Sequence, residues 1–180
     1  IDGYAFYGCS SLTSINIPNS VNSIGAEAFE GCSSLTSIDI PSSVTSIENY
    51  TFDDCSSLIS INIPSSVTSI GFRAFSGCSS LTSIKIPDSV TSIGGAAFEK
   101  CSSLTSINVL NSVISIGESA FAGCSAIEQI GFNSVKSFGD YAFANCSSLD
   151  IVYLGDSRLN SIGAYAFCGC SSLRLKRTIF

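Results

Sequence analysis

The chain has no histidine, no methionine and no tryptophan among its 180 residues. Histidine is the usual base that activates a serine or cysteine nucleophile, and it is also a common zinc ligand. Its absence therefore argues against a triad enzyme and against a mixed zinc site. The sequence also lacks a phosphate-binding glycine loop and paired CxxC motifs. We expect no catalytic residue, no cofactor and no metal site in this chain.

Positive charge is scarce as well. Eight lysines and arginines stand against fourteen aspartates and glutamates, which gives a net charge of −6 and an isoelectric point near 4.4. Such a chain offers no basic stripe that could neutralise phosphates, so nucleic acid is excluded as a partner. The sequence contains neither a targeting segment nor an apolar run long enough to cross a bilayer. We therefore expect no direct membrane insertion of this fragment.

One unit is repeated along nearly the whole length of the chain. Cysteines recur at intervals of 22 to 24 residues, most often 23, and phenylalanines keep the same spacing. The cysteines that mark the repeat are Cys9, Cys32, Cys55, Cys78, Cys101, Cys124, Cys146 and Cys170. A fixed period of this length is typical of a solenoid, in which each unit forms one coil. We expect a single solenoid domain over residues 1–180, made of about seven 23-residue repeats.

The unit LTSIKIPDSVTSIGGAAFEKC, from Leu81 to Cys101, shows how one coil is built. The stretch LTSIKIP alternates isoleucine with polar residues, which predicts a short strand that the proline ends, because proline cannot donate to a ladder. Residues 90–93 predict a second short extended segment, and Ala97-Phe98 predicts a tight helical or 3₁₀ turn. One coil alone buries too few side chains to be stable, so neighbouring coils must stack.

The repeat LxxIxIPxSVxxIGxxAFxxC resembles the leucine-rich repeat of the BspA-like, or Treponema-type, surface proteins over nearly the whole chain. The resemblance implies a right-handed, β-rich solenoid with a parallel sheet on its concave face, short second strands, and helical or 3₁₀ turns on its convex side. It also implies a non-enzymatic adhesion or protein-binding module, at the cell surface or outside the cell. The implied partners are matrix or host-cell surface proteins. A structural spacer without its own ligand is the alternative.

The cysteines at the repeated position are interpreted as a ladder. Their Cβ atoms would lie about 4.8 Å apart and point the same way, whereas a disulfide needs about 3.8 Å and converging bonds. We therefore interpret these eight as buried free thiols that pack as small hydrophobic residues. From the residues that hold the position of Cys168 in other units we expect exposure. They are Tyr7, Glu30, Asp53, Ser76, Glu99, Ala122 and Ala144. Cys168 is interpreted as an incidental surface thiol, with an intermolecular disulfide as the alternative.

The chain opens at Ile1 in the middle of a unit. A solenoid that ended there would expose a strand edge and a section of the core. We therefore expect a fragment of a longer protein. Self-association through exposed solenoid ends, or through Cys168, is a further expectation.

The acidic residues gather in the segment before each cysteine, which the resemblance places on the convex side. Nine of the fourteen lie there: Asp2, Glu27, Glu30, Glu48, Asp53, Asp54, Glu99, Glu118 and Asp140. We interpret this surface as solubilising and self-repelling, and the adjacent pair Asp53-Asp54 as a solvated turn.

The outward-pointing residues of the first strand form the predicted contact face. If the residues six and eight places after each cysteine point inward, those five and seven places after it point outward on the concave sheet. The candidate ligand contacts are Ser14, Asn16, Ser37, Asp39, Ser60, Asn62, Ser83, Lys85, Ser106, Asn108, Gln129 and Tyr153. Only Tyr153 resembles the aromatic anchors of protein interfaces. Contacts of this kind gain affinity when many repeats act together; the alternative is that they only keep the sheet soluble.

Overall fold

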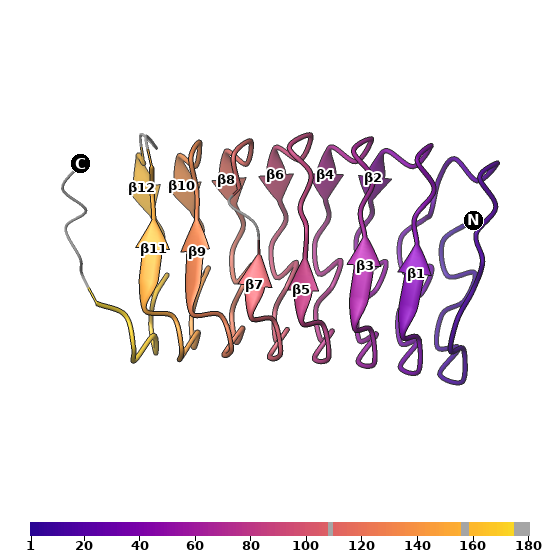
Figure 1. Cartoon of the computed structure of the whole chain (residues 1–180), viewed down its shortest axis with the longest axis horizontal. Coiled ribbons are helices and arrows are strands. Elements are labelled where there is room, and N and C mark those ends of the chain that lie inside the picture. The colour runs from indigo at the N-terminus through magenta and orange to yellow at the C-terminus, as the bar shows by residue number, and fades with distance from the viewer. Residues whose placement is uncertain (108–109, 156–158, 175–180) are drawn as a thin grey trace.

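The computed structural model describes residues 1–107, 110–155 and 159–174. They form a parallel β-solenoid whose coils stand side by side along the long axis of the molecule (Figure 1). The first strands of the coils are β1 (Ser37–Asp39), β3 (Ser60–Asn62), β5 (Ser83–Ile84), β7 (Ser106–Ile107), β9 (Gln129–Gly131) and β11 (Ile151–Tyr153). The second strands are β2 (Ser46–Ile47), β4 (Ser69–Ile70), β6 (Ser92–Ile93), β8 (Ser115–Ile116), β10 (Ser137–Phe138) and β12 (Ser161–Ile162).

The two rows of strands are paired in register from coil to coil. The second strands form one six-stranded sheet in the order β12-β10-β8-β6-β4-β2. The first strands pair as β1 with β3, β5 with β7 and β9 with β11, and a bridge between Asn62 and Lys85 joins β3 to β5. Because the repeat is nearly constant, equivalent residues face each other across every pair, as Ser37 faces Ser60. Each position of the repeat therefore forms a column along the solenoid.

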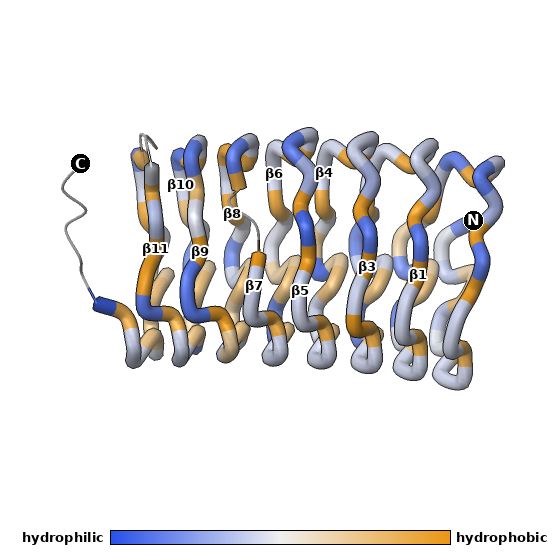
Figure 2. The backbone as a smooth tube through the Cα atoms, in the orientation of Figure 1, coloured by the Kyte–Doolittle hydropathy of each residue, from blue (hydrophilic) through white to orange (hydrophobic). Residues whose placement is uncertain are grey.

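The apolar positions of the repeat lie between the two rows and form one continuous core. Hydrophobic residues recur at equivalent places in successive coils (Figure 2). The phenylalanines before each cysteine stack almost parallel from Phe6 to Phe167, with ring centroids 5.1 to 5.6 Å apart and interplanar angles of 2 to 10°. Each inner ring is thus covered on both faces by its neighbours.

The predicted helical or 3₁₀ turn is wrong, because this segment is a chain of β-turns. In one coil, the Ala28 amide closes a turn onto the Gly25 carbonyl at 3.3 Å. The amides of Glu27, Phe29 and Gly31 instead donate to carbonyls of the next coil at 3.0, 3.0 and 2.8 Å. Positive φ angles at Glu27 (59°) and Gly31 (70°) turn alternate amides outward, so the consecutive bonds of a helix cannot form. The described residues contain no helix, and hence none that could span a membrane.

The second strand is shorter than residues 90–93. It covers only Ser92–Ile93, because the Val90 amide closes a turn onto the Pro87 carbonyl at 3.0 Å and leaves the ladder. The same turn recurs one coil earlier, where Val67 donates to Pro64 at 3.0 Å. The proline carbonyl therefore accepts the bond of the turn between the two strands. The first strands β9 and β11 end at the same place of the repeat without a proline, so proline is not what ends them.

Candidate functional site

The first-strand face presents the predicted contact residues to solvent. All of the candidates that the structure describes are exposed, from Ser14 to Tyr153. Asn108 lies outside the described residues. Ser14 and Asn16 precede the first assigned strand, whereas the other described candidates lie on first strands or, for Lys85, at the bridge to Asn62. The contact role of these residues remains a prediction.

Two columns make up this face. One contains Ser37, Ser60, Ser83 and Ser106, which pair across neighbouring strands, and it continues with Gln129 and Ile151. The other runs from Asp39 through Asn62 to Lys85 and ends in Gly131 paired with Tyr153. The face is small and polar over its first coils and becomes larger and more apolar over its last ones.

A hollow of about 260 Å³ opens where the face changes character. Gly131 supplies no side chain at a place that Asp39, Asn62 and Lys85 fill in other coils. The floor consists of Ile107, Ile130 and Gly131, and the rim consists of Thr105, Ser106, Gln129 and Tyr153. Three of the predicted contacts, Ser106, Gln129 and Tyr153, therefore meet at one depression. Tyr153 is 42% exposed, so its ring remains available to a partner.

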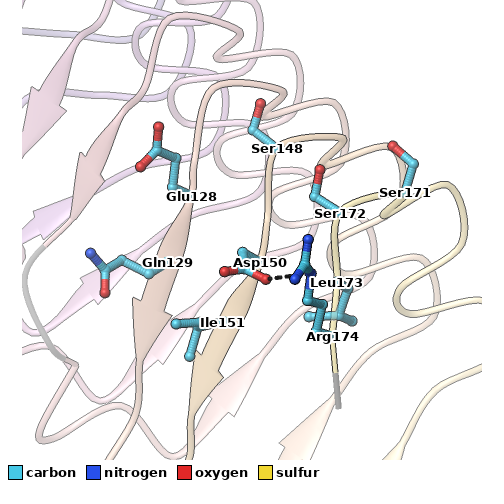
Figure 3. A pocket seen from close by; sticks show the side chains of 9 residues that line it. All are labelled: Glu128, Gln129, Ser148, Asp150, Ile151, Ser171, Ser172, Leu173 and Arg174. Carbon is cyan, nitrogen blue, oxygen red and sulfur yellow. Dashed lines mark ion pairs between the residues drawn. The ribbon is translucent and has the colours of Figure 1, made fainter. Parts of the chain in front are cut away.

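A second and more polar hollow of about 590 Å³ lies at the last described coil (Figure 3). Gln129 and Ile151 border it on the strand side, next to Glu128 and Asp150. The Arg174 guanidinium reaches the Asp150 carboxylate across it, with Nε 3.8 Å from Oδ1. Gln129 lines both hollows, so they are neighbours on one surface.

The cysteine ladder is buried only where coils cover it on both sides. Cys32, Cys55, Cys78, Cys101, Cys124 and Cys146 are buried free thiols, as predicted. The prediction is wrong for Cys9, which is exposed, and for Cys170, which is half-buried. Both lie in the outermost coils that the structure describes.

The buried thiols are more than small hydrophobic residues. Each donates a hydrogen bond to the carbonyl of the phenylalanine in the preceding coil, as Cys78 Sγ does to Phe52 O at 3.2 Å. Equivalent bonds of 3.0 to 3.2 Å join Cys32 to Phe6 and Cys124 to Phe98. Burial raises the pKa of the Cys78 and Cys124 thiols well above the usual value, so they stay protonated. The buried thiols therefore stabilise the stacked coils, whereas at the end of the ladder the hydrogen bond with the Cys146 side chain lowers the pKa of Cys170.

Cys168 is exposed as predicted, but for a different reason. The equivalent residues Asp53, Ser76 and Ala144 are buried, so the repeat position itself does not confer exposure. Its exposure is a feature of its own coil, the last one that the structure describes.

The prediction that Asp53 lies in a solvated turn is also wrong. Asp53 is only 4% exposed and pairs with Arg73, whose Nε lies 3.2 Å from Oδ2, while Asp54 is exposed. Asp53 Oδ1 and Ser76 Oγ are buried and have no hydrogen-bond partner among the described residues. Burial raises the Asp53 pKa above its usual value, against the lowering effects of the nearby Ser76 and Arg73 side chains.

The main feature that the sequence reasoning missed is a set of aromatic residues beside these acids. We call the seven residues before each cysteine the turn side: 2–8, 25–31, 48–54, 71–77, 94–100, 117–123, 139–145 and 163–169. Besides the buried ladder, the turn side carries Tyr4, Tyr7, Tyr50, Phe72, Tyr141 and Tyr165, and all but Tyr50 are exposed. Tyrosine at the fifth place before the cysteine in four coils is the signal that could have identified this surface.

Repeated coils, a parallel sheet on each side and a continuous aliphatic and phenylalanine core define a leucine-rich-repeat solenoid. The model of the BspA type leucine-rich repeat region matches six copies over residues 1–125 and 68–176. The chain belongs to this family. No protein with a curated description matches it.

Solved structures of bacterial leucine-rich-repeat proteins resemble the whole solenoid. The Treponema pallidum protein TpLRR is 32% identical, with a TM-score of 0.77 over 97% of this chain and 71% of that one. A Eubacterium ventriosum protein is 27% identical, with a TM-score of 0.82 over 93% of this chain and 45% of that one. A leucine-rich cell surface protein of Faecalibacterium prausnitzii is 27% identical, with a TM-score of 0.60 over 97% and 62%.

Proposed function

We propose that this chain is a non-enzymatic adhesion module of a surface or secreted protein, and that it binds matrix or host-cell proteins through the first-strand face. The observation that supports this most is the hollow between Ser106, Gln129 and Tyr153, because a depression with an apolar floor, a polar rim and an exposed aromatic is what a protein ligand can anchor in. The cell-surface description of the Faecalibacterium relative supports the proposed location.

The columns leading to the hollow support a many-contact mode of binding. Ser37, Ser60 and Ser83 repeat one hydrogen-bonding group at every coil, with Asp39 and Lys85 adding one charge of each sign. Each exposed contact is weak, on the order of 1 kcal/mol or less. A ligand that spans several coils would add such contacts, with the residues around Tyr153 as the strongest part of the site.

The test is binding of the chain to immobilised fibronectin, fibrinogen and mucin. One variant carries Asp39→Ala, Lys85→Ala and Tyr153→Ala on the first-strand face. Its matched control removes the same residue types elsewhere: Asp2→Ala, Lys136→Ala and Tyr165→Ala, all at exposed positions.

We expect saturable binding to at least one of these proteins, lost in the first-strand variant and kept in the control. Absence of binding by a folded chain would contradict the proposal and favour a structural spacer. Equal loss in both variants would exclude the first-strand face as the specific contact surface.

A further inference from the structure

The turn side carries the whole negative excess of the protein. Nine of the fourteen acids lie there with two bases, Arg73 and Lys100, which leaves a net charge of −7. Because the whole chain carries −6, the remaining residues together carry +1. This asymmetry gives the turn side a negative field that the first-strand face does not share.

Aromatic rings lie among these acids in one connected surface. The Tyr4 hydroxyl donates to Glu27 Oε1 at 2.9 Å, and the Tyr50 and Phe72 rings meet edge to face with centroids 5.3 Å apart. Tyr4 and Phe72 are 61% and 44% exposed. We call Tyr4, Glu27, Glu30, Tyr50, Phe72, Glu99 and Glu118 the acidic–aromatic patch. Exposed rings beside unpaired carboxylates have no role in the core, which the buried phenylalanine ladder fills.

The chain's own Arg73 demonstrates how this surface holds a cation. Its Nε lies 3.2 Å from Asp53 Oδ2, and its guanidinium carbon lies 6.0 Å from the centre of the Tyr50 ring. A carboxylate and an aromatic face are thus used together, the combination that favours guanidinium groups. Asp53 keeps its second oxygen buried and unpartnered, so one arginine does not satisfy the acids present.

A place for a further cation lies one coil away. A hollow of about 280 Å³ is bounded by Phe72, Glu99 and Glu118, with Arg73 at its edge. The hollow exists because Gly95 and Ala96 have almost no side chain. The Phe72 ring covers Gly95, and its nearest carbon lies 3.2 Å from the place that a Cβ atom of residue 95 would occupy. Glu99, Glu118 and the Phe72 ring line this open space, so its chemistry resembles that of the Arg73 site. Arg73 lines it as well, which leaves its lining with a net charge of −1.

We propose that the acidic–aromatic patch is a second interaction surface, which binds an arginine- or lysine-rich segment of another protein and takes one cationic side chain into the hollow beside Phe72. Glu27 and Glu30 lie in one coil and Glu99 lies three coils further along the solenoid. At ~4.8 Å per coil this is roughly 14 Å, a span that one extended basic segment can cover.

The test is binding of an acetylated and amidated octa-arginine peptide, with the neutral octa-citrulline peptide of the same shape as the control ligand. The patch variant carries four substitutions: Glu27→Gln, Glu30→Gln, Glu99→Gln and Glu118→Gln. The charge-matched variant neutralises the four described acids outside the turn side: Asp39→Asn, Asp88→Asn, Glu128→Gln and Asp150→Asn. Circular dichroism first establishes that both variants fold.

We expect saturable binding of octa-arginine and none of octa-citrulline. The patch variant should weaken the affinity at least about fourfold, since each of its four exposed charge pairs contributes a factor of about 1.4 to 5. The charge-matched variant should change it less than about threefold, through the long-range field alone. Phe72→Ser should weaken it about 2- to 5-fold, whereas Ile114→Ser, at another exposed apolar residue, should leave it unchanged.

Equal losses in the patch and charge-matched variants would overturn the proposal, because binding would then follow net charge alone. Absence of saturable octa-arginine binding would overturn it as well. The first-strand variant Asp39→Ala, Lys85→Ala and Tyr153→Ala should keep octa-arginine binding within about threefold, which separates this surface from the one proposed above.

Discussion

The middle coils, residues 32–101, and the last coils, residues 124–174, are built on one repeat but vary it differently. In the middle coils the exposed columns are uniform, with serine at one place and Asp39, Asn62 and Lys85 at the other. In the last coils the spacing changes to 22 and 24 residues, and Gln129, Gly131, Ile151 and Tyr153 replace those polar residues. The buried residues keep the coils in register, whereas the residues at exposed positions can change and so form a binding site.

The core of the last coils adapts to the change in spacing with larger rings. Phe132 and Phe138 occupy places that isoleucine holds in other coils, and both are buried. They pack edge to face with each other and against Phe143, with centroids 5.3 to 5.9 Å apart. The stack of ladder phenylalanines continues through this region unbroken.

The largest effect on stability is expected from substitutions in the stack of phenylalanines, where an inner ring can be compared with an outer one. Phe75 is fully buried between Phe52 and Phe98, at 5.4 and 5.3 Å, whereas Phe167 is half-buried and stacks on Phe143 alone in the ladder. Phe75→Ala should lower the free energy of unfolding by about 3–5 kcal/mol. Phe167→Ala should cost at most about half of that, because less of its surface leaves water on folding.

Urea unfolding of both variants measures the two costs. Equal costs for Phe75→Ala and Phe167→Ala would mean that the outer and inner rings are equally enclosed, which would break the distinction between covered and uncovered coils. A cost for Phe75→Ala near zero would contradict its place between the rings on either side.

The stacked phenylalanines show how much of this fold the sequence predicts. The period alone predicts parallel coils in register, the columns of exposed residues and the stacked phenylalanines, because each follows from equal spacing. The turn conformation could not be predicted in this way. It depends on amides such as that of Glu27 bonding to the next coil, which stabilises a positive φ that costs a non-glycine residue about 1–2 kcal/mol.

Exposure at the candidate sites was predictable only in part, for a related reason. One repeat position is buried at Asp53, half-buried at Glu99 and exposed at Cys168, because burial depends on the side chain and on its neighbours in the adjoining coils. The hollow beside Tyr153 likewise requires Gly131 on the paired strand, a coincidence of two coils that a single repeat does not reveal.

A smaller effect is expected at the cysteines. Cys78→Ser places a hydroxyl with a shorter bond where Sγ now donates to Phe52 O, fully out of solvent. We expect a loss of about 1–3 kcal/mol from desolvation and imperfect geometry. Cys9→Ser, at an exposed end of the same ladder, should stay within about 0.5 kcal/mol of the parent. Thermal unfolding of the two variants measures this, and equal shifts would mean that the buried thiol bond contributes no stability.

The smallest effect on stability is expected at Asp53. Its pH dependence shows whether burial or the ion pair with Arg73 has the larger influence on this carboxyl group. Burial raises the Asp53 pKa in the folded chain above its ordinary value of 3.8, although Ser76 and Arg73 oppose the shift. Between these two pKa values the folded state holds a proton that the unfolded state has lost. The stability that this group contributes is therefore fully present below pH 3.8 and falls as the pH rises through the raised pKa.

Asp53→Asn removes this titration, so the stability of the parent relative to the variant should decrease as the pH rises from about 3.8. Urea unfolding across that range measures the difference, and Asp54→Asn, at the exposed neighbour, is the control. A difference that instead grows with pH would mean that the Arg73 ion pair at 3.2 Å outweighs the cost of burying the carboxylate. Asp53 would then stabilise the stacking of its coil on the next one through charge, and the middle coils would depend on more than their apolar core.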